Sequence, residues 1–109
     1  MIIEKMNLTV PPTKRQQMGS ALASLVGPTQ VQQGCLSCEL YQDWSNEGPL
    51  RIESRWANQE DLVRHLQTDT YKRLLLLMEL APSPPVLEFY TVVEIRGLDL
   101  VESARDASA

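Results

Sequence analysis

Three side chains suited to holding a flat ligand occur close together in the run ESRWANQEDLVRHLQTDTYKRLLLLMEL. Trp56 ends a predicted strand, His65 lies at the edge of an apolar helical stripe, and Tyr71 opens the next helical stretch. An indole, an imidazole and a phenol around an apolar cavity suit an aromatic molecule held by stacking and a few hydrogen bonds. Each residue also has a purely structural interpretation, as a core anchor, a helix-edge hydrogen bond or simple packing.

The two cysteines of the chain, Cys35 and Cys38, have a Cys-x-x-Cys spacing. Redox chemistry at this spacing needs the first thiol at a helix N-terminus, whereas the flanking GCLSCELYQD is typical of a strand. Residues three apart on a regular strand point to opposite faces, so a mutual disulfide is disfavoured. We interpret both as reduced thiols packed as small hydrophobic groups, with metal or redox use as the alternative.

The sequence lacks the motifs of several large enzyme classes. It contains no Gly-x-Gly-x-x-Gly, no P-loop, no nucleophile elbow and no HExxH. The single histidine of the chain excludes a multi-histidine metal site within one subunit, so we expect no bound metal. Acid–base work by His65 alone remains open.

Apolar periodicity predicts strands alternating with helices. The first strand has one apolar face, Ile2, Met6, Leu8 and Val10, in which Glu4 is the exception. We expect strands at 1–10, 35–44, 50–57 and 86–96, a helix at 14–26 ended by Gly27-Pro28, and a helix in two pieces at 59–67 and about 69–80. This order predicts an α+β, ferredoxin-like β-α-β-β-α-β fold with one antiparallel sheet and helices on one face.

The length of 109 residues predicts one domain, which we place at 1–101, followed by a flexible C-terminal tail at 102–109. Helices can cover only one face of such a sheet, and the predicted strands carry apolar groups on both faces. A second copy of the chain can supply the missing layer, so we expect a homodimer.

Composition limits the classes of binding partner and the cellular compartments that suit this protein. Lys and Arg number 10 against 14 Asp and Glu, and this net charge of −4 disfavours nucleic acid as a partner. No apolar run has the length of a membrane span, and Glu4 and Lys5 interrupt an N-terminal stretch that does not resemble a signal peptide. We therefore expect a cytoplasmic protein without a membrane partner.

The sequence resembles the antibiotic biosynthesis monooxygenase (ABM) domains of the dimeric α/β-barrel proteins, which include quinol monooxygenases. The matching residues are QQGCLSCELYQD at 32–43, the spacing from Trp56 through Leu62 to His65 and Leu66, and then Asp69 and Tyr71. The likeness extends over residues 2–97. It implies a ferredoxin-like protomer, a homodimer whose sheets form a barrel, and oxidation of a small phenolic or quinol molecule by O₂ without a metal, haem or flavin cofactor.

On this resemblance His65 would transfer the phenolic proton, Trp56 would stack on the substrate, and Tyr71, Tyr41 or Asn7 would orient its oxygens. A haem-degrading branch of the family is similar in an Asn on the first strand, a Trp on the helix and an iron-ligating His beyond it. Here His65 stands where that Trp falls and Leu75 where that His falls, so haem degradation is disfavoured.

Two other interpretations of the same fold remain. One is a non-catalytic module that binds a small molecule or serves dimerisation, because a fold does not by itself confer an activity. The other is a different dimeric-barrel chemistry, such as cyclisation or isomerisation. Oxygen uptake with a panel of phenols separates the first from a monooxygenase, and the mass of the product separates the second.

Overall fold

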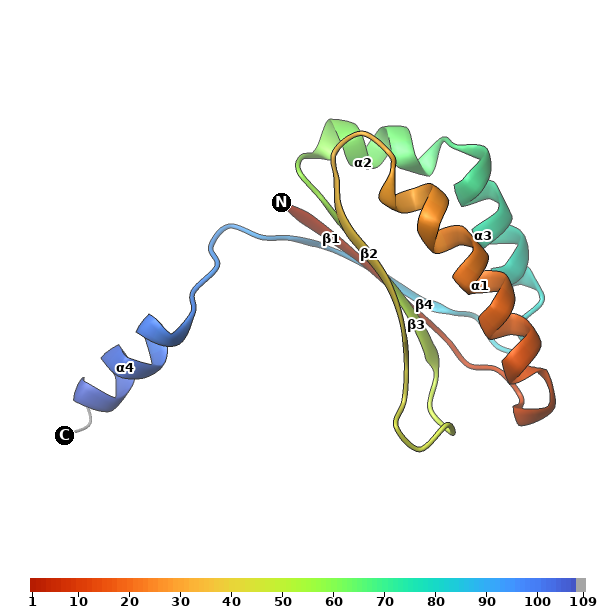
Figure 1. Ribbon diagram of the computed structural model, residues 1–109, viewed down its shortest axis with the longest axis horizontal. Coiled ribbons are helices and arrows are strands. Elements are labelled where there is room, and N and C mark those ends of the chain that lie inside the picture. The colour runs from red at the N-terminus through yellow and green to blue at the C-terminus, as the bar shows by residue number, and fades with distance from the viewer. Residues whose placement is uncertain (108–109) are drawn as a thin grey trace.

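The computed structural model describes residues 1–107, which form one four-stranded sheet with helices packed on one face (Figure 1). The elements in chain order are β1 (Ile2–Leu8), a 3₁₀ turn (Pro12–Lys14), α1 (Arg15–Gln30), β2 (Cys35–Gln42), β3 (Leu50–Trp56), α2 (Gln59–Leu66), α3 (Asp69–Glu79), β4 (Val86–Thr91) and α4 (Leu98–Ala107).

The sheet has the strand order β2-β3-β1-β4, and every neighbouring pair is antiparallel. The strand β1 occupies an inner position, where Met6 pairs with Ile52 of β3 on one side and with Leu87 of β4 on the other. The helices α1, α2 and α3 connect the strands over a single face (Figure 1). The predicted α+β, ferredoxin-like fold with one antiparallel sheet is therefore confirmed.

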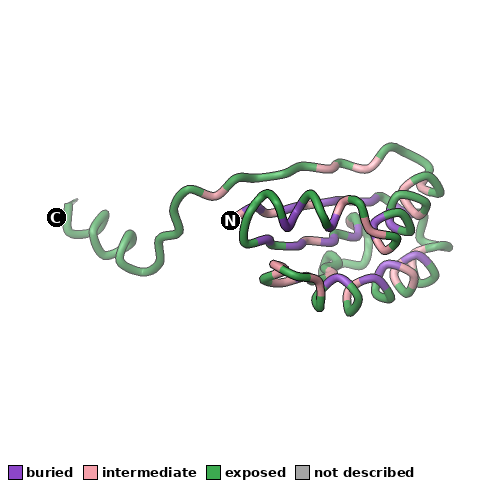
Figure 2. The backbone as a smooth tube through the Cα atoms, turned by 90° about the horizontal axis from the view of Figure 1, so that it is seen from above, coloured by how far each residue is buried: buried purple, intermediate pink, exposed green. Residues whose placement is uncertain are grey.

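The core lies between this sheet face and the helices. Buried positions of β1 and β3 alternate with intermediate or exposed ones, as a half-covered sheet requires (Figure 2). The helix α1 contributes Met18, Leu22 and Leu25 to the core. The helix α2 begins after Asn58, whose side chain caps it by accepting a hydrogen bond from the Asp61 amide. The buried apolar cluster contains Met6, Leu8, Val10, Met18, Leu22, Leu25, Cys38, Leu50, Ile52, Tyr71 and Leu74.

The helix α1 does not end at Gly27-Pro28 as the sequence suggested, but continues to Gln30 with Pro28 inside it. Proline removes one backbone hydrogen bond there, yet the last turn is held by packing. Leu25 and Thr29 are both buried, and the Thr29 hydroxyl donates to the Leu25 carbonyl at 2.8 Å. Tertiary contacts thus override the local helix-breaking signal.

The uncovered sheet face only partly meets the expectation of an apolar surface. Its outward residues, by strand register, include three cations (Lys5, Arg51, Arg55) and three anions (Glu39, Glu53, Glu88). Aromatic and aliphatic groups are interspersed among these charges: Ile3, Tyr41, Val86 and Tyr90. The face is mixed in charge and carries equal numbers of both signs.

The chain leaves the sheet after β4 as a C-terminal arm (residues 92–107) that projects from the body (Figure 1). The last strand is shorter than predicted because Thr91 already pairs with Ile2, the first residue of β1. The segment predicted as a flexible tail, 102–109, is helical as far as residue 107, where α4 ends, and residues 108–109 lie outside the described part. The arm raises the radius of gyration to 16.5 Å, against about 13 Å for a compact chain of this length.

Within residues 1–107, no helix has the combination of length and apolar character that crossing a membrane requires.

Candidate functional site

A buried carboxylate lies at the centre of the sheet. Glu4 follows the inward register of Ile2, Met6 and Leu8, and the residue is only 4% exposed. Because β1 is an inner strand, Glu4 lies opposite Ser54 of β3 and is covered by the helices. An ionised carboxylate at such depth is costly unless hydrogen-bond donors surround it, and here they do.

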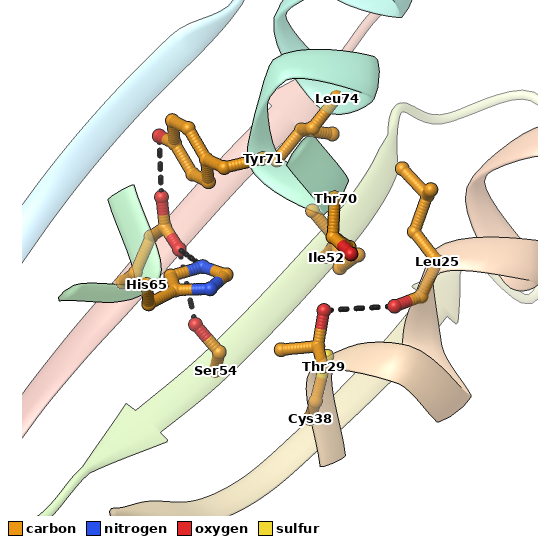
Figure 3. A pocket seen from close by; sticks show the side chains of 10 residues that line it. Leu25, Thr29, Cys38, Ile52, Ser54, His65, Thr70, Tyr71 and Leu74 are labelled. Atoms are coloured by element: carbon orange, nitrogen blue, oxygen red, sulfur yellow. Dashed lines mark hydrogen bonds and ion pairs between the residues drawn. The ribbon is translucent and has the colours of Figure 1, made fainter. Parts of the chain in front are cut away.

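Three side chains from three different elements converge on Glu4 (Figure 3). The Ser54 hydroxyl donates to Oε1 at 3.0 Å, and the Tyr71 hydroxyl donates to Oε2 at 2.7 Å. The Nε2 atom of His65 lies 3.3 Å from Oε1. All three partners are themselves buried, so the group forms a connected polar network inside an apolar core.

Trp56 completes this network from the end of β3. Its indole N–H donates to the Ser54 hydroxyl at 2.9 Å, and its ring stacks on His65 with 4.3 Å between centroids and 23° between planes. Tyr71 also contacts the imidazole, in an edge-on arrangement with 5.0 Å between centroids and 79° between planes. The imidazole therefore contacts two aromatic rings, which restrict its orientation.

The junction between α2 and α3 positions His65 and Tyr71 together. Thr68 caps α3 by accepting a hydrogen bond from the Tyr71 amide at 3.1 Å, while its hydroxyl donates to the His65 carbonyl at 2.7 Å. The second ring nitrogen of His65, Nδ1, lies 2.8 Å from Oε1 of Gln32, in the connection between α1 and β2.

Burial controls the titration of two groups beside this network. Desolvation, and then the charge of Glu4, raise the pKa of Tyr71 well above its usual range, so its hydroxyl remains a donor. Burial also raises the pKa of the Cys38 thiol to about 12, so this thiol stays protonated and unreactive at neutral pH.

A small cavity opens beside the Glu4 carboxylate, between the sheet and the helices α1 and α3 (Figure 3). Its volume is about 10 Å³, enough for about one water molecule. An aromatic ring enters only if the lining side chains move. The remaining lining consists of Leu25, Thr29, Cys38, Ile52, Ser54, His65, Thr70, Tyr71 and Leu74.

The structure unites three of the five site residues indicated by the sequence. His65 contacts both Trp56 and Tyr71, whereas Asn7 and Tyr41 lie on the uncovered face of the sheet. There Asn7 accepts a hydrogen bond from Arg51 at 3.0 Å. On this face Asn7 and Tyr41 lie across the sheet from His65, so their positions do not support a substrate-binding role beside His65 of the same protomer.

Glu4, Ser54 and Gln32 were missed as site residues. A signal existed for Glu4, because it interrupts the apolar face of an otherwise alternating strand, and a carboxylate in that register must be paired. No comparable signal in the sequence marks Ser54 or Gln32 as a site residue.

The cysteines occupy the same sheet face, contrary to the expectation of opposite faces. A bulge between Cys35 and Ser37 leaves Leu36 without a partner, so that Cys35 pairs with Trp56 and Cys38 with Ser54. Both partners are inward residues of β3. Both thiols are free, and among residues 1–107 no group of three or more His, Cys, Asp or Glu side chains could hold a metal ion.

The antibiotic biosynthesis monooxygenase family matches residues 1–75, which contain every member of the buried network. The chain belongs to this family. The ABM match ends inside α3, so β4 and the C-terminal arm lie beyond it.

Solved structures share the ABM-like fold of this chain. Rv0793 from Mycobacterium tuberculosis superposes with a TM-score of 0.77 at 20% identity, covering 88% of this chain and 98% of that one. PA3566 from Pseudomonas aeruginosa gives a TM-score of 0.73 at 20% identity, with coverage of 85% and 94%. The uncharacterized protein sll1783 of Synechocystis is 23% identical over 93 residues, or 84% of this chain. This chain spans 63% of the length of that relative.

Proposed function

We propose that this chain is a cofactor-independent monooxygenase that oxidises a phenolic or quinol-type small molecule with O₂. The observation that carries the proposal is the buried contact of His65 with Trp56, Tyr71 and Glu4, inside the segment matched by the ABM family. The arrangement supplies a stacking surface, hydrogen-bond donors and a carboxylate at one point in an apolar interior.

The chemistry needs few protein groups. A phenolate is electron-rich enough to reduce O₂ itself, and oxidation of a phenol to a quinone leaves one oxygen atom in the quinone and the other in water. This balance requires no external electron donor. The protein must favour the phenolate and keep bulk water from the reactive intermediate, and a site covered by α1, α2 and α3 suits both tasks.

Oxygen consumption in the presence of a panel of quinols and phenols tests this function, with isotopically labelled O₂ to follow one atom into the product. We expect uptake that His65→Ala abolishes. Glu60→Gln, an isosteric change in the exposed first turn of the same helix, is the matched control and should retain full uptake. Absence of uptake with every compound would refute a monooxygenase of this substrate class.

The small volume of the cavity favours one second candidate, a module of the same fold without catalytic activity. A cavity of about 10 Å³ holds about one water molecule and, without rearrangement, no substrate ring. Binding of a phenol without oxygen uptake would favour this candidate.

We also infer that the protein works as a homodimer in the cytoplasm. The uncovered sheet face carries three charges of each sign, so a second copy can meet it under two-fold symmetry without an excess of like charge. Val93, Ile95 and Leu98 of the arm are each at least 69% exposed, which favours their burial against that copy. The two free thiols suit a reducing compartment.

A further inference from the structure

We propose that Glu4 is the catalytic base of this site and that His65 is its fixed positive counter-charge. This inference rests on the proposed function, because it concerns the group that accepts the phenolic proton. It reverses the role that the sequence suggests for the imidazole.

The contacts of His65 place an oxygen atom beside each of its two ring nitrogens. Nδ1 faces the amide oxygen of Gln32 at 2.8 Å, and Nε2 faces the carboxylate oxygen of Glu4 at 3.3 Å. Both oxygens are acceptors, and each ring nitrogen satisfies its neighbour only by carrying a hydrogen. The geometry therefore fits an imidazolium ion, which can donate a proton but cannot accept one.

Glu4 has the opposite character. Ser54 and Tyr71 both donate to it and His65 faces it, so three donors support an ionised carboxylate. The Ser54 hydroxyl is committed to this direction, because its oxygen accepts the indole N–H of Trp56. A carboxylate offers about four lone-pair sites, and these three partners leave one for the hydroxyl of a ligand.

Within residues 1–107, no other titratable group that lines the cavity competes for this role. From α3, Tyr71 already donates its own hydrogen to Glu4, and from β2, Cys38 is a protonated thiol. From α2, His65 has an oxygen atom beside each of its ring nitrogens. The Glu4 carboxylate also lines the cavity, so a phenol that displaces the lining side chains meets it directly.

Proton transfer to Glu4 keeps the number of buried charges constant. The phenolic O–H bond breaks, its proton forms a new O–H bond on Glu4, and the electron pair stays on the phenolate oxygen. The phenolate then takes the place of the carboxylate as the negative partner of the His65 imidazolium. Since the buried site holds one positive and one negative charge before and after the step, no additional charge is desolvated.

The single histidine of the chain makes the first test unambiguous, because it gives one set of ring nitrogen signals by NMR. We expect the imidazolium pattern at pH 7 in the free protein and the same pattern after para-nitrophenol binds. A ring that is neutral in the free protein and gains a proton on binding would identify His65 as the base and overturn the proposal. The free-protein measurement needs neither ligand nor activity.

Infrared difference spectroscopy follows the proton to its destination. Binding of para-nitrophenol should produce the band of a protonated carboxyl group together with the visible absorbance of the nitrophenolate. Glu4→Gln should abolish the carboxyl band and lower kcat with the best phenolic substrate by about 100-fold or more. Glu39→Gln, on the uncovered face of β2, should leave both unchanged. A carboxyl band that persists in Glu4→Gln would overturn the assignment.

The experiments distinguish a failure of the proposed monooxygenase function from a failure of the proposed role of Glu4. If neither phenol binding nor oxygen uptake is found, the proposed function falls, and the state of the free His65 ring still decides whether Glu4 and His65 form a charged pair. If oxygen uptake is found and Glu4→Gln retains it in full, the proposed function stands and Glu4 is not the base.

Discussion

The Tyr71 hydroxyl donates to Glu4 across 2.7 Å, although 67 residues separate the two along the chain. This contact joins α3 to the inner strand β1 through the middle of the core. It also fixes the orientation of the carboxylate that faces His65, so a single hydrogen bond links the packing of the helices to the chemistry of the site.

Removing this hydroxyl should destabilise the protein measurably. Tyr71→Phe leaves the ring in place but takes one donor from a buried carboxylate, and hydrogen bonds to charged groups contribute about 2 kcal/mol. We expect the free energy of unfolding in urea to fall by about that amount. Tyr90→Phe, on the uncovered face of β4, should change it by less than about 0.5 kcal/mol. Equal effects of the two variants would contradict the network.

Alkaline pH should destabilise the fold through Cys38. The thiol is protonated in the folded state up to its pKa of about 12, whereas in the unfolded chain it ionises near its ordinary value of 9.0. Unfolding therefore releases a proton between these pH values, and the free energy of unfolding falls by up to about 1.4 kcal/mol per pH unit. Well below pH 9.0 the thiol is protonated in both the folded and the unfolded state, so the free energy of unfolding does not depend on this group.

Urea titrations at a series of pH values, for the wild type and Cys38→Ala, measure this slope directly. The variant should show a flatter profile just above pH 9.0, whatever its stability at neutral pH. Tyr71 adds a second loss above about pH 10, the ordinary tyrosine value, since its pKa is also raised by burial. A wild-type profile without slope in this range would contradict the burial of both groups.

The two tryptophans should report on different surroundings. Trp56 is fully buried against His65, whereas Trp44 is 99% exposed. In Trp44→Phe we expect the remaining fluorescence to be blue-shifted and protected from iodide, with a stability change below about 0.5 kcal/mol. A phenol that enters the site should alter this emission, and the same phenol should leave the emission of Trp56→Phe unchanged.

Replacing either of two glycines by alanine should change the stability of the protein, in opposite directions. Gly34 has a positive φ of 81°, and a Cβ there would overlap the Asp61 side chain, so Gly34→Ala should cost at least about 1–2 kcal/mol. Gly19 lies within α1, and a Cβ there would meet only a Leu50 methyl group at 4.0 Å, an ordinary contact, so Gly19→Ala should stabilise by about 1 kcal/mol. Thermal unfolding of both variants decides whether the two signs differ.

Removal of α4 should affect assembly and not the core. No residue of this helix is buried, so a chain ending at Gly97 should keep the unfolding free energy of the dilute monomer. Sedimentation at increasing concentration should show that the truncated chain self-associates more weakly than the intact one. Equal association of both chains would exclude the helix from the proposed dimer interface.

The order of elements and the meeting of three site residues could be predicted because both follow from local patterns. Alternation and helical periodicity locate the strands and helices, and the Asn58 cap fixes where α2 begins. Trp56, His65 and Tyr71 lie within sixteen positions of one another, so a strand followed by two short helices brings them together.

The remaining features depend on contacts between distant segments. Glu4 was visible as an exception, but its partners lie 50 to 67 residues away, and only the strand register shows that Ser54 is opposite. The bulge at Leu36 changes the side of the sheet that Cys35 faces without any change in the local pattern. Pro28 remains helical because Leu25 and Thr29 are buried, which local propensity cannot reveal.

The inner position of β1 has a consequence for how the molecule forms. Glu4 is synthesised before its partners at 54, 65 and 71, which follow 50 residues or more later, and the edge strand β4 comes later still. Closing such long loops is slow, because chain entropy opposes it until several contacts exist. We therefore expect the nascent chain to acquire its helices first and its reactive centre last.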